Sequence, residues 1–231
     1  MSKLNIEIDP KQDLKPVSIE ALTASIYSAL TALQILTDSS QNKGDCDVSC
    51  GAIEWFETPE TIEFVRKSAM WLLLEPLWLY AEKGQLVRPK DHLNDVIGDL
   101  LKWVCAIEAI SEYSGENVHT PILKVITKFL ARLKLDYQID LSSGGNVKRY
   151  PDLSDGLVGI SWLPQVSDKN LTIIELALLA GVSNIRSVRN AQYDKDNPLV
   201  FIKTGKNVEV EIDVAKQWLA KRRGFVATNH E

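Results

Sequence analysis

The sequence is poor in the residues that disulfide-bonded and membrane-spanning proteins need. It has only three cysteines in 231 residues. Because this count is odd and no apolar secretory segment lies near residue 1, we expect a reduced, cytoplasmic protein. The most apolar segment, AMWLLLEPLWLYA at residues 69–81, is shorter than the about 20 residues that cross a bilayer, and Glu75 and Pro76 interrupt it. We expect this segment to be buried core.

Motifs for catalysis and metal binding are scarce as well. The chain has no Gly-rich phosphate-binding loop and no nucleophile elbow. Cys46 and Cys50 are four residues apart, and Cys105, His92 and His119 lie elsewhere, whereas a structural zinc site usually shows a tighter, paired pattern. We therefore interpret these residues as ordinary thiols and histidines, and we expect no metal, no cofactor and no enzymatic activity.

Positive charge is in deficit over most of the chain, whose net charge is −5. Residues 1–170 carry 17 Lys and Arg against 24 Asp and Glu, whereas residues 171–231 carry 9 against 7. The two parts therefore have net charges of −7 and +2. Because binding to a phosphate backbone needs Lys and Arg where contact is made, a nucleic-acid surface is expected in the C-terminal part.

The first part does contain helix-forming sequence, with apolar residues at three- and four-residue spacing. A first helix is predicted over residues 17–37, where Ser18 is suited to be the N-cap. A second is predicted to begin at Thr58-Pro59, because proline suits a first helical position, and to run toward Glu75. Pro76 is expected to kink or end it.

Two more helices complete the predicted N-terminal bundle. They cover residues 91–113 and the segment PILKVITKFLARLK at 121–134. Their apolar stripes must be covered by neighbouring helices or by another subunit, so residues 1–141 are predicted to form a helical domain for self-association or partner binding. Residues 142–167 are rich in turn formers and are predicted to be a linker.

The stretch LTIIELALLAGVSNIRSVRNA at residues 171–191 predicts two short helices joined by a tight turn. Thr172 and Glu175 have the spacing of a capping box at the start of the first helix. Gly181 suits a left-handed backbone conformation, and Ser183 is expected to cap the second helix.

The second of these helices has two different faces. Its buried side is predicted to contain Ile185, Val188 and Ala191. Its outer side is basic and hydrogen-bonding, and it contains Arg186, Arg189, Asn190 and Tyr193. Arginine can bond guanine or phosphate and asparagine can pair with adenine, so this side has the chemistry of a helix that enters the major groove.

A β-hairpin is predicted in LVFIKTGKNVEVEI, residues 199–212, because three apolar residues alternate with Glu209 and Glu211. Its tip places Lys203 and Lys206 forward, where a wing would touch the DNA backbone. The alternating apolar residues are Val208, Val210 and Ile212.

A last helix, VAKQWLAKRRGF at residues 214–225, is predicted to follow with Asp213 as its cap. Val214, Trp218 and Leu219 are expected to pack on the unit. Lys221, Arg222 and Arg223 are expected to remain in solvent.

With ELALLAGVS and DVAKQWLAKR in place, this order of elements resembles the winged helix-turn-helix domains of the MerR and excisionase type. The resemblance covers about the last 60 residues and implies that Arg186, Arg189 and Asn190 lie in or beside the major groove, with the turn from Lys203 to Lys206 as the wing. Ser187 stands where the common pattern has a buried aliphatic residue. Either the turn is one residue longer, or the second helix is rotated.

The sequence thus predicts a mainly α protein with an N-terminal helical bundle (1–141), a linker (142–167) and a winged helix-turn-helix with a small β-hairpin (168–231). The hypothesis is a DNA-binding transcriptional regulator that docks on double-stranded DNA as a homodimer formed by the helical domain. The alternative is a non-catalytic scaffold whose winged domain binds a protein. The predicted contact residues are Ser183, Asn184, Arg186, Ser187, Arg189, Asn190, Tyr193, Lys203, Lys206, Arg222 and Arg223.

Overall fold

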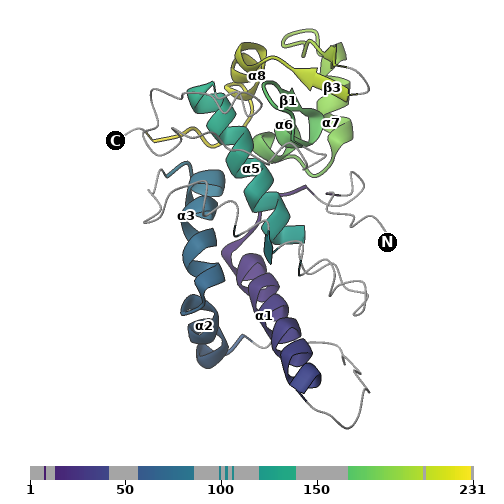
Figure 1. Ribbon diagram of the computed structural model, residues 1–231. Coiled ribbons are helices and arrows are strands. Elements are labelled where there is room, and N and C mark those ends of the chain that lie inside the picture. The colour runs from purple at the N-terminus through teal and green to yellow at the C-terminus, as the bar shows by residue number, and fades with distance from the viewer. Residues whose placement is uncertain are drawn as a thin grey trace.

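The computed structural model describes residues 8, 14–41, 57–85, 99, 102, 103, 106, 120–138, 166–204 and 207–229. The described chain is mainly helical and includes one small antiparallel sheet (Figure 1), as predicted. In chain order the elements are α1 (Ile19–Gln41), α2 (Pro59–Arg66), α3 (Ala69–Lys83), α5 (Thr120–Tyr137), β1 (Leu171–Thr172), α6 (Ile173–Ala180), α7 (Ile185–Asn190), a 3₁₀ turn (Ala191–Tyr193), β2 (Ile202–Thr204), β3 (Asn207–Val210) and α8 (Ile212–Leu219).

Helix α5 lies between the other helices of the first part and the C-terminal elements (Figure 1). From Ile122 to Leu135 all of its residues except Lys124 are buried. One continuous apolar core joins the elements on both sides of α5, and it includes Leu22 of α1, Leu74 of α3, Phe129 of α5, Leu176 of α6 and Trp218 of α8. None of the described helices is both long and apolar enough to cross a membrane.

The first two helices begin where the sequence predicts. The Ser18 hydroxyl accepts the Ala21 N–H at 3.1 Å. Thr58 and Thr61 form a capping box, in which each hydroxyl accepts the backbone N–H of the other residue, at 3.2 and 3.0 Å, and Pro59 is the first residue of α2. These caps satisfy amides that have no partner inside the helix.

The prediction of one helix that runs from Pro59 toward Glu75 and ends at Pro76 is wrong. The break comes earlier, at residues 67–68, where the Ser68 hydroxyl accepts the Trp71 N–H at 3.1 Å and starts a new helix, α3. Pro76 lies inside α3. It removes one backbone hydrogen bond, but Leu72, whose carbonyl loses that bond, is 60% exposed, so water can replace it.

The other predictions for the first part are met to different extents. Helix α5 covers the predicted 121–134 segment and runs on to Tyr137. The helix predicted over 91–113 lies outside the described residues except for Asp99, Lys102, Trp103 and Ala106, which have helical backbone. The cysteines, His92, His119 and residues 142–165 of the predicted linker also lie outside them. Within the described part, no group of His, Cys, Asp and Glu could hold a metal ion.

The sheet has a strand that the sequence analysis missed. Strand β3 lies in the middle and pairs antiparallel with β2, as predicted, and also with β1. Because Leu171, the first residue of β1, pairs with Val210, no partner strand continues beyond Val210. Ile212 therefore starts α8 instead of extending the hairpin, and Asp213 lies in the first turn of α8 and is not its cap.

Helix α5 brings three cations into the core, and each has a partner. Lys128 Nζ lies 2.6 Å from Glu82 Oε2. The guanidinium of Arg132 donates to the carbonyls of Ala81 and Val226 and to the Thr228 hydroxyl. Partners of this kind are required because an isolated charge in the core is very unfavourable.

The third cation, Lys134, joins α5 to the C-terminal elements. Its Nζ lies 2.5 Å from Glu175 Oε1 and donates to the carbonyls of Ser167 and Asn170 at 2.8 and 2.7 Å. Both charged side chains are 0% exposed. Burial lowers the pKa of Lys134 and raises that of Glu175, while each partner's charge opposes the shift of the other.

Residues 226–229, which follow α8, contact α5 and the C-terminal end of α3. The Asn229 N–H donates to the Gly84 carbonyl at 2.9 Å. Gly84 ends α3 with φ +66, and a Cβ there would lie 2.3 Å from the Ala227 carbonyl oxygen. Only glycine satisfies both the backbone conformation and the close approach.

We expect Lys134→Met to lower the free energy of unfolding by about 3–5 kcal/mol, because Glu175 is left buried without a counter-ion. The double variant Lys134→Met/Glu175→Gln is expected to be more stable than Lys134→Met alone, since it contains no buried charge at this position. Urea unfolding measures both. The control is Lys67→Met, which breaks the exposed ion pair with Glu63 and is expected to cost less than about 1 kcal/mol. Equal stability of Lys134→Met and the control would contradict the role assigned to the pair.

Candidate nucleic-acid interface

Helix α6 begins with the predicted capping box. The Thr172 hydroxyl accepts the Glu175 N–H at 3.2 Å, and Glu175 Oε2 accepts the Thr172 N–H at 2.8 Å. Glu175 therefore has two roles, because its other carboxylate oxygen lies against Lys134. Its spacing from Thr172 predicted the cap, but no pattern in the sequence indicated its buried counter-ion, Lys134.

The turn after α6 has the predicted left-handed glycine. Gly181 has φ +64, and its N–H bonds to carbonyls of the last turn of α6. A Cβ at Gly181 would also lie 2.9 Å from the Gly224 carbonyl oxygen. The C-terminal segment thus packs directly on this turn.

The cap of α7 differs from the prediction. Asn184, not Ser183, is the N-cap, and its Oδ1 accepts the N–H groups of Arg186 and Ser187 at 2.9 and 3.4 Å. The turn between α6 and α7 is therefore one residue longer than the predicted cap at Ser183 implied. Ser187 is exposed and the following Val188 is buried.

The two faces of α7 are arranged as the helical wheel predicts. Ile185, Val188 and Ala191 are buried, at 9%, 0% and 5% exposure. The opposite side chains are exposed, and we call them the outer face of α7: Arg186, Ser187, Arg189 and Asn190. Tyr193, in the following 3₁₀ turn, is 78% exposed.

No acid of the described part of the chain pairs with either arginine of the outer face. Among the described residues, no carboxylate lies within ion-pair distance of Arg186 or Arg189. Helix α5 and the other helices of the first part leave both side chains exposed. Two unpaired guanidinium groups three residues apart on one helix face are available to bind a planar or anionic group.

The N-terminal segment also supports this turn, which the sequence analysis missed. Leu14 is fully buried, and its N–H donates to the Ser183 carbonyl at 2.9 Å. The chain then passes Val17, whose carbonyl accepts the Trp78 indole N–H at 2.8 Å, and enters α1. Such contacts between distant segments leave no periodic signal in a sequence.

The hairpin β2–β3 exposes one described lysine, whereas one of its two glutamates is buried. Lys203 is exposed and pairs with Val208 across the hairpin, whereas Lys206 lies outside the described residues. Glu209, which alternates with Val208 and Val210 along the strand, is only 5% exposed and accepts a hydrogen bond from Asn170 Nδ2 at 3.1 Å. Asn170, which directly precedes β1, therefore lies against the Glu209 side chain.

The expectation that Arg222 remains in solvent is wrong. Its guanidinium lies 4.2 Å from the centre of the Trp218 ring and 3.4 Å from Asp194 Oδ2, and only a third of the side chain, 33%, is exposed. Lys221, next to it, is exposed and donates to Asn197 Oδ1 at 3.2 Å. Arg223 is exposed.

Asp194 is held in its charged form at this position. Its pKa is lowered, first by a hydrogen bond from the Asp196 N–H and further by the Asn197 N–H and by Arg222. Asp194 and Arg222 therefore neutralise each other beside the outer face of α7. Asp168, Asp196, Glu211 and Asp213 are the acidic side chains of the described C-terminal part that remain exposed.

No known protein family matches the chain, and neither curated proteins nor solved structures give a match.

We expect Asn184→Ala to lower the free energy of unfolding by about 1 kcal/mol, because two N–H groups at the start of α7 lose their acceptor. Ser183→Ala is the matched control, since Ser183 precedes the cap and is expected to change stability by less than about 0.5 kcal/mol. Thermal or urea unfolding of the full chain measures both. A larger loss of stability for Ser183→Ala than for Asn184→Ala would indicate that Ser183, and not Asn184, is the cap of α7.

Proposed function

We propose that the protein binds double-stranded DNA and regulates transcription. In this proposal the C-terminal part is a winged helix-turn-helix of the MerR and excisionase type, with α6 and α7 as the helix pair and β2–β3 as the wing. The observation that carries the proposal is the outer face of α7. Its two arginines are exposed and have no acidic partner among the residues that the structure describes, and the other side of the helix is packed. This is the arrangement that a major-groove helix requires.

Each polar residue of this surface has a role in the proposal. Arg186, Arg189 and Asn190 face base edges or the adjacent phosphates, because arginine recognises guanine or phosphate and asparagine recognises adenine. Ser183, Asn184, Ser187 and Tyr193 surround them. Lys203 of the wing and Arg223 after α8 contact the DNA backbone, where any cation strengthens binding without reading sequence.

The electrostatics favour modest affinity for each copy. Burial of Glu209 removes one negative charge from the surface, and pairing of Asp194 with Arg222 neutralises one charge of each sign, but the whole chain keeps a net charge of −5. Two copies on one duplex add their phosphate contacts. A homodimer formed by the helical part is therefore part of the proposal.

A protein-binding role is the second candidate, and one observation favours it. Tyr193 and Val200, near the outer face of α7, are 78% and 60% exposed. Aromatic residues and arginine are enriched at protein interfaces. In this alternative the same surface holds a protein partner, and the chain is a scaffold.

DNA binding is tested with the double variant Arg186→Ala/Arg189→Ala in the full chain. Titration against a mixed-sequence duplex at two salt concentrations is expected to show binding that weakens steeply with salt in the natural protein. The variant is expected to lose about 10-fold or more in affinity, because each lost contact is worth on the order of 1–3 kcal/mol. The matched control, Arg66→Ala/Lys67→Ala, removes two exposed cations at the C-terminal end of α2 and is expected to bind normally.

The same titration separates the two candidates. Salt-insensitive binding, or an equal loss in both double variants, would contradict a role for α7 in DNA binding. Absence of binding even at low salt would favour the scaffold.

We expect Lys203→Ala to weaken binding to every duplex by a similar factor and to reduce the slope of log affinity against log salt by about 1, because one phosphate contact is lost. Salt titrations on two duplexes of different sequence measure both effects. A loss confined to one of the sequences would mean that Lys203 reads bases and is not a backbone contact.

A further inference from the structure

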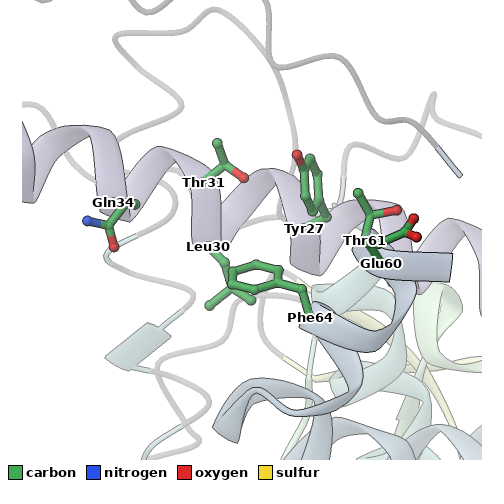
Figure 2. A pocket seen from close by; sticks show the side chains of 7 residues that line it. All are labelled: Tyr27, Leu30, Thr31, Gln34, Glu60, Thr61 and Phe64. Atoms are coloured by element: carbon green, nitrogen blue, oxygen red, sulfur yellow. The ribbon is translucent and has the colours of Figure 1, made fainter. Parts of the chain in front are cut away.

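A cavity of about 460 Å³ lies between α1 and α2, away from α7 (Figure 1, Figure 2). Figure 2 shows Leu30 and Phe64 between the two helices, with Tyr27 near Thr61 and Glu60 at one end and Gln34 further along α1. Its size is in the range of sites that hold small organic molecules. None of the residues that line the cavity belongs to the proposed DNA-binding surface.

The apolar part of the lining is aromatic. The rings of Tyr27 and Phe64 pack edge to face, with centroids 6.2 Å apart and planes at 81°. Phe64 is 54% exposed, although it is a large apolar residue on a helix whose Val65 is fully buried. A ligand that covers Phe64 would bury apolar surface that now faces water.

The polar part of the lining carries a single charge. Glu60 is the one acidic or basic side chain among the lining residues, which also include the polar residues Thr31, Gln34 and Thr61. A hydrogen bond from its own backbone amide and one from Thr58 lower the pKa of Glu60, so it is charged at neutral pH. Glu60 lines the same cavity as the two aromatic rings. Its charge attracts a cation, and the negative faces of the rings add to this attraction.

We propose that the cavity binds a small organic cation with an apolar body, of the arylalkylammonium class. The ammonium group lies against Glu60 and the aromatic faces, and the apolar body covers Leu30 and Phe64. Binding at this cavity does not require the protein to bind DNA.

The test compares three probes of the same shape against the full chain by calorimetry or ligand-observed NMR. They are 2-phenylethylammonium, the uncharged 2-phenylethanol and the anion 3-phenylpropionate, each at concentrations up to about 10 mM, where ligands of this size are detected. The ammonium probe is expected to bind about 5-fold more tightly than the alcohol, and the anion is expected to bind most weakly. Equal binding of the three probes, or no binding of the ammonium probe, would overturn the proposal.

Two variants locate the site. Glu60→Gln is expected to remove the preference for the ammonium probe and to leave the alcohol unaffected, and Phe64→Ala is expected to weaken both. The α2 caps are provided by Thr58 and Thr61, so neither variant removes the start of the helix. The matched control is Glu63→Gln, on the same helix but outside the cavity lining. A control variant that lowers ammonium binding as much as Glu60→Gln would show that general surface charge, and not the cavity, holds the probe.

Discussion

The buried ion pair between Lys134 and Glu175 is the interaction on which the rest of the structure depends. It joins α5, the centre of the core, to the first turn of α6, and the same lysine holds the carbonyls of the segment that leads into β1. Because both side chains are fully buried, neither can be lost without leaving an uncompensated charge. The position of α6 relative to α5 is therefore fixed by the need to pair these two buried charges, as well as by apolar packing.

The proposed function depends on this constraint. Helix α6 is joined to α7 by the turn that contains Gly181, and both Gly224 and Leu14 contact this turn. Helix α7 is short and packs through Ile185 and Val188, which leaves Arg186 and Arg189 in solvent. The helical part thus contributes to presenting the outer face of α7, and we propose that it also brings two copies together on one duplex.

Local signals in the sequence predicted much of this arrangement. Helical periodicity predicted α1 and α5, and the spacing of Thr172 and Glu175 predicted the start of α6. A helical wheel predicted the two faces of α7. Each of these features depends on residues that are close in the chain. Two errors came from contacts between distant residues, because Glu209 is hydrogen-bonded to Asn170 and Arg222 is paired with Asp194. The error at Pro76 is local: the carbonyl that loses its helical hydrogen bond belongs to Leu72, which is exposed.

The central claim is that α5 and the pair α6–α7 form one rigid body. Residual dipolar couplings of backbone N–H groups in these three helices of the full chain test it most directly, because a rigid body has one alignment tensor. The account predicts that a single tensor fits the couplings of α5 and of α6–α7 in the orientation given by the structure. Two tensors of different magnitude would show that the C-terminal helices move independently of α5, and would contradict it.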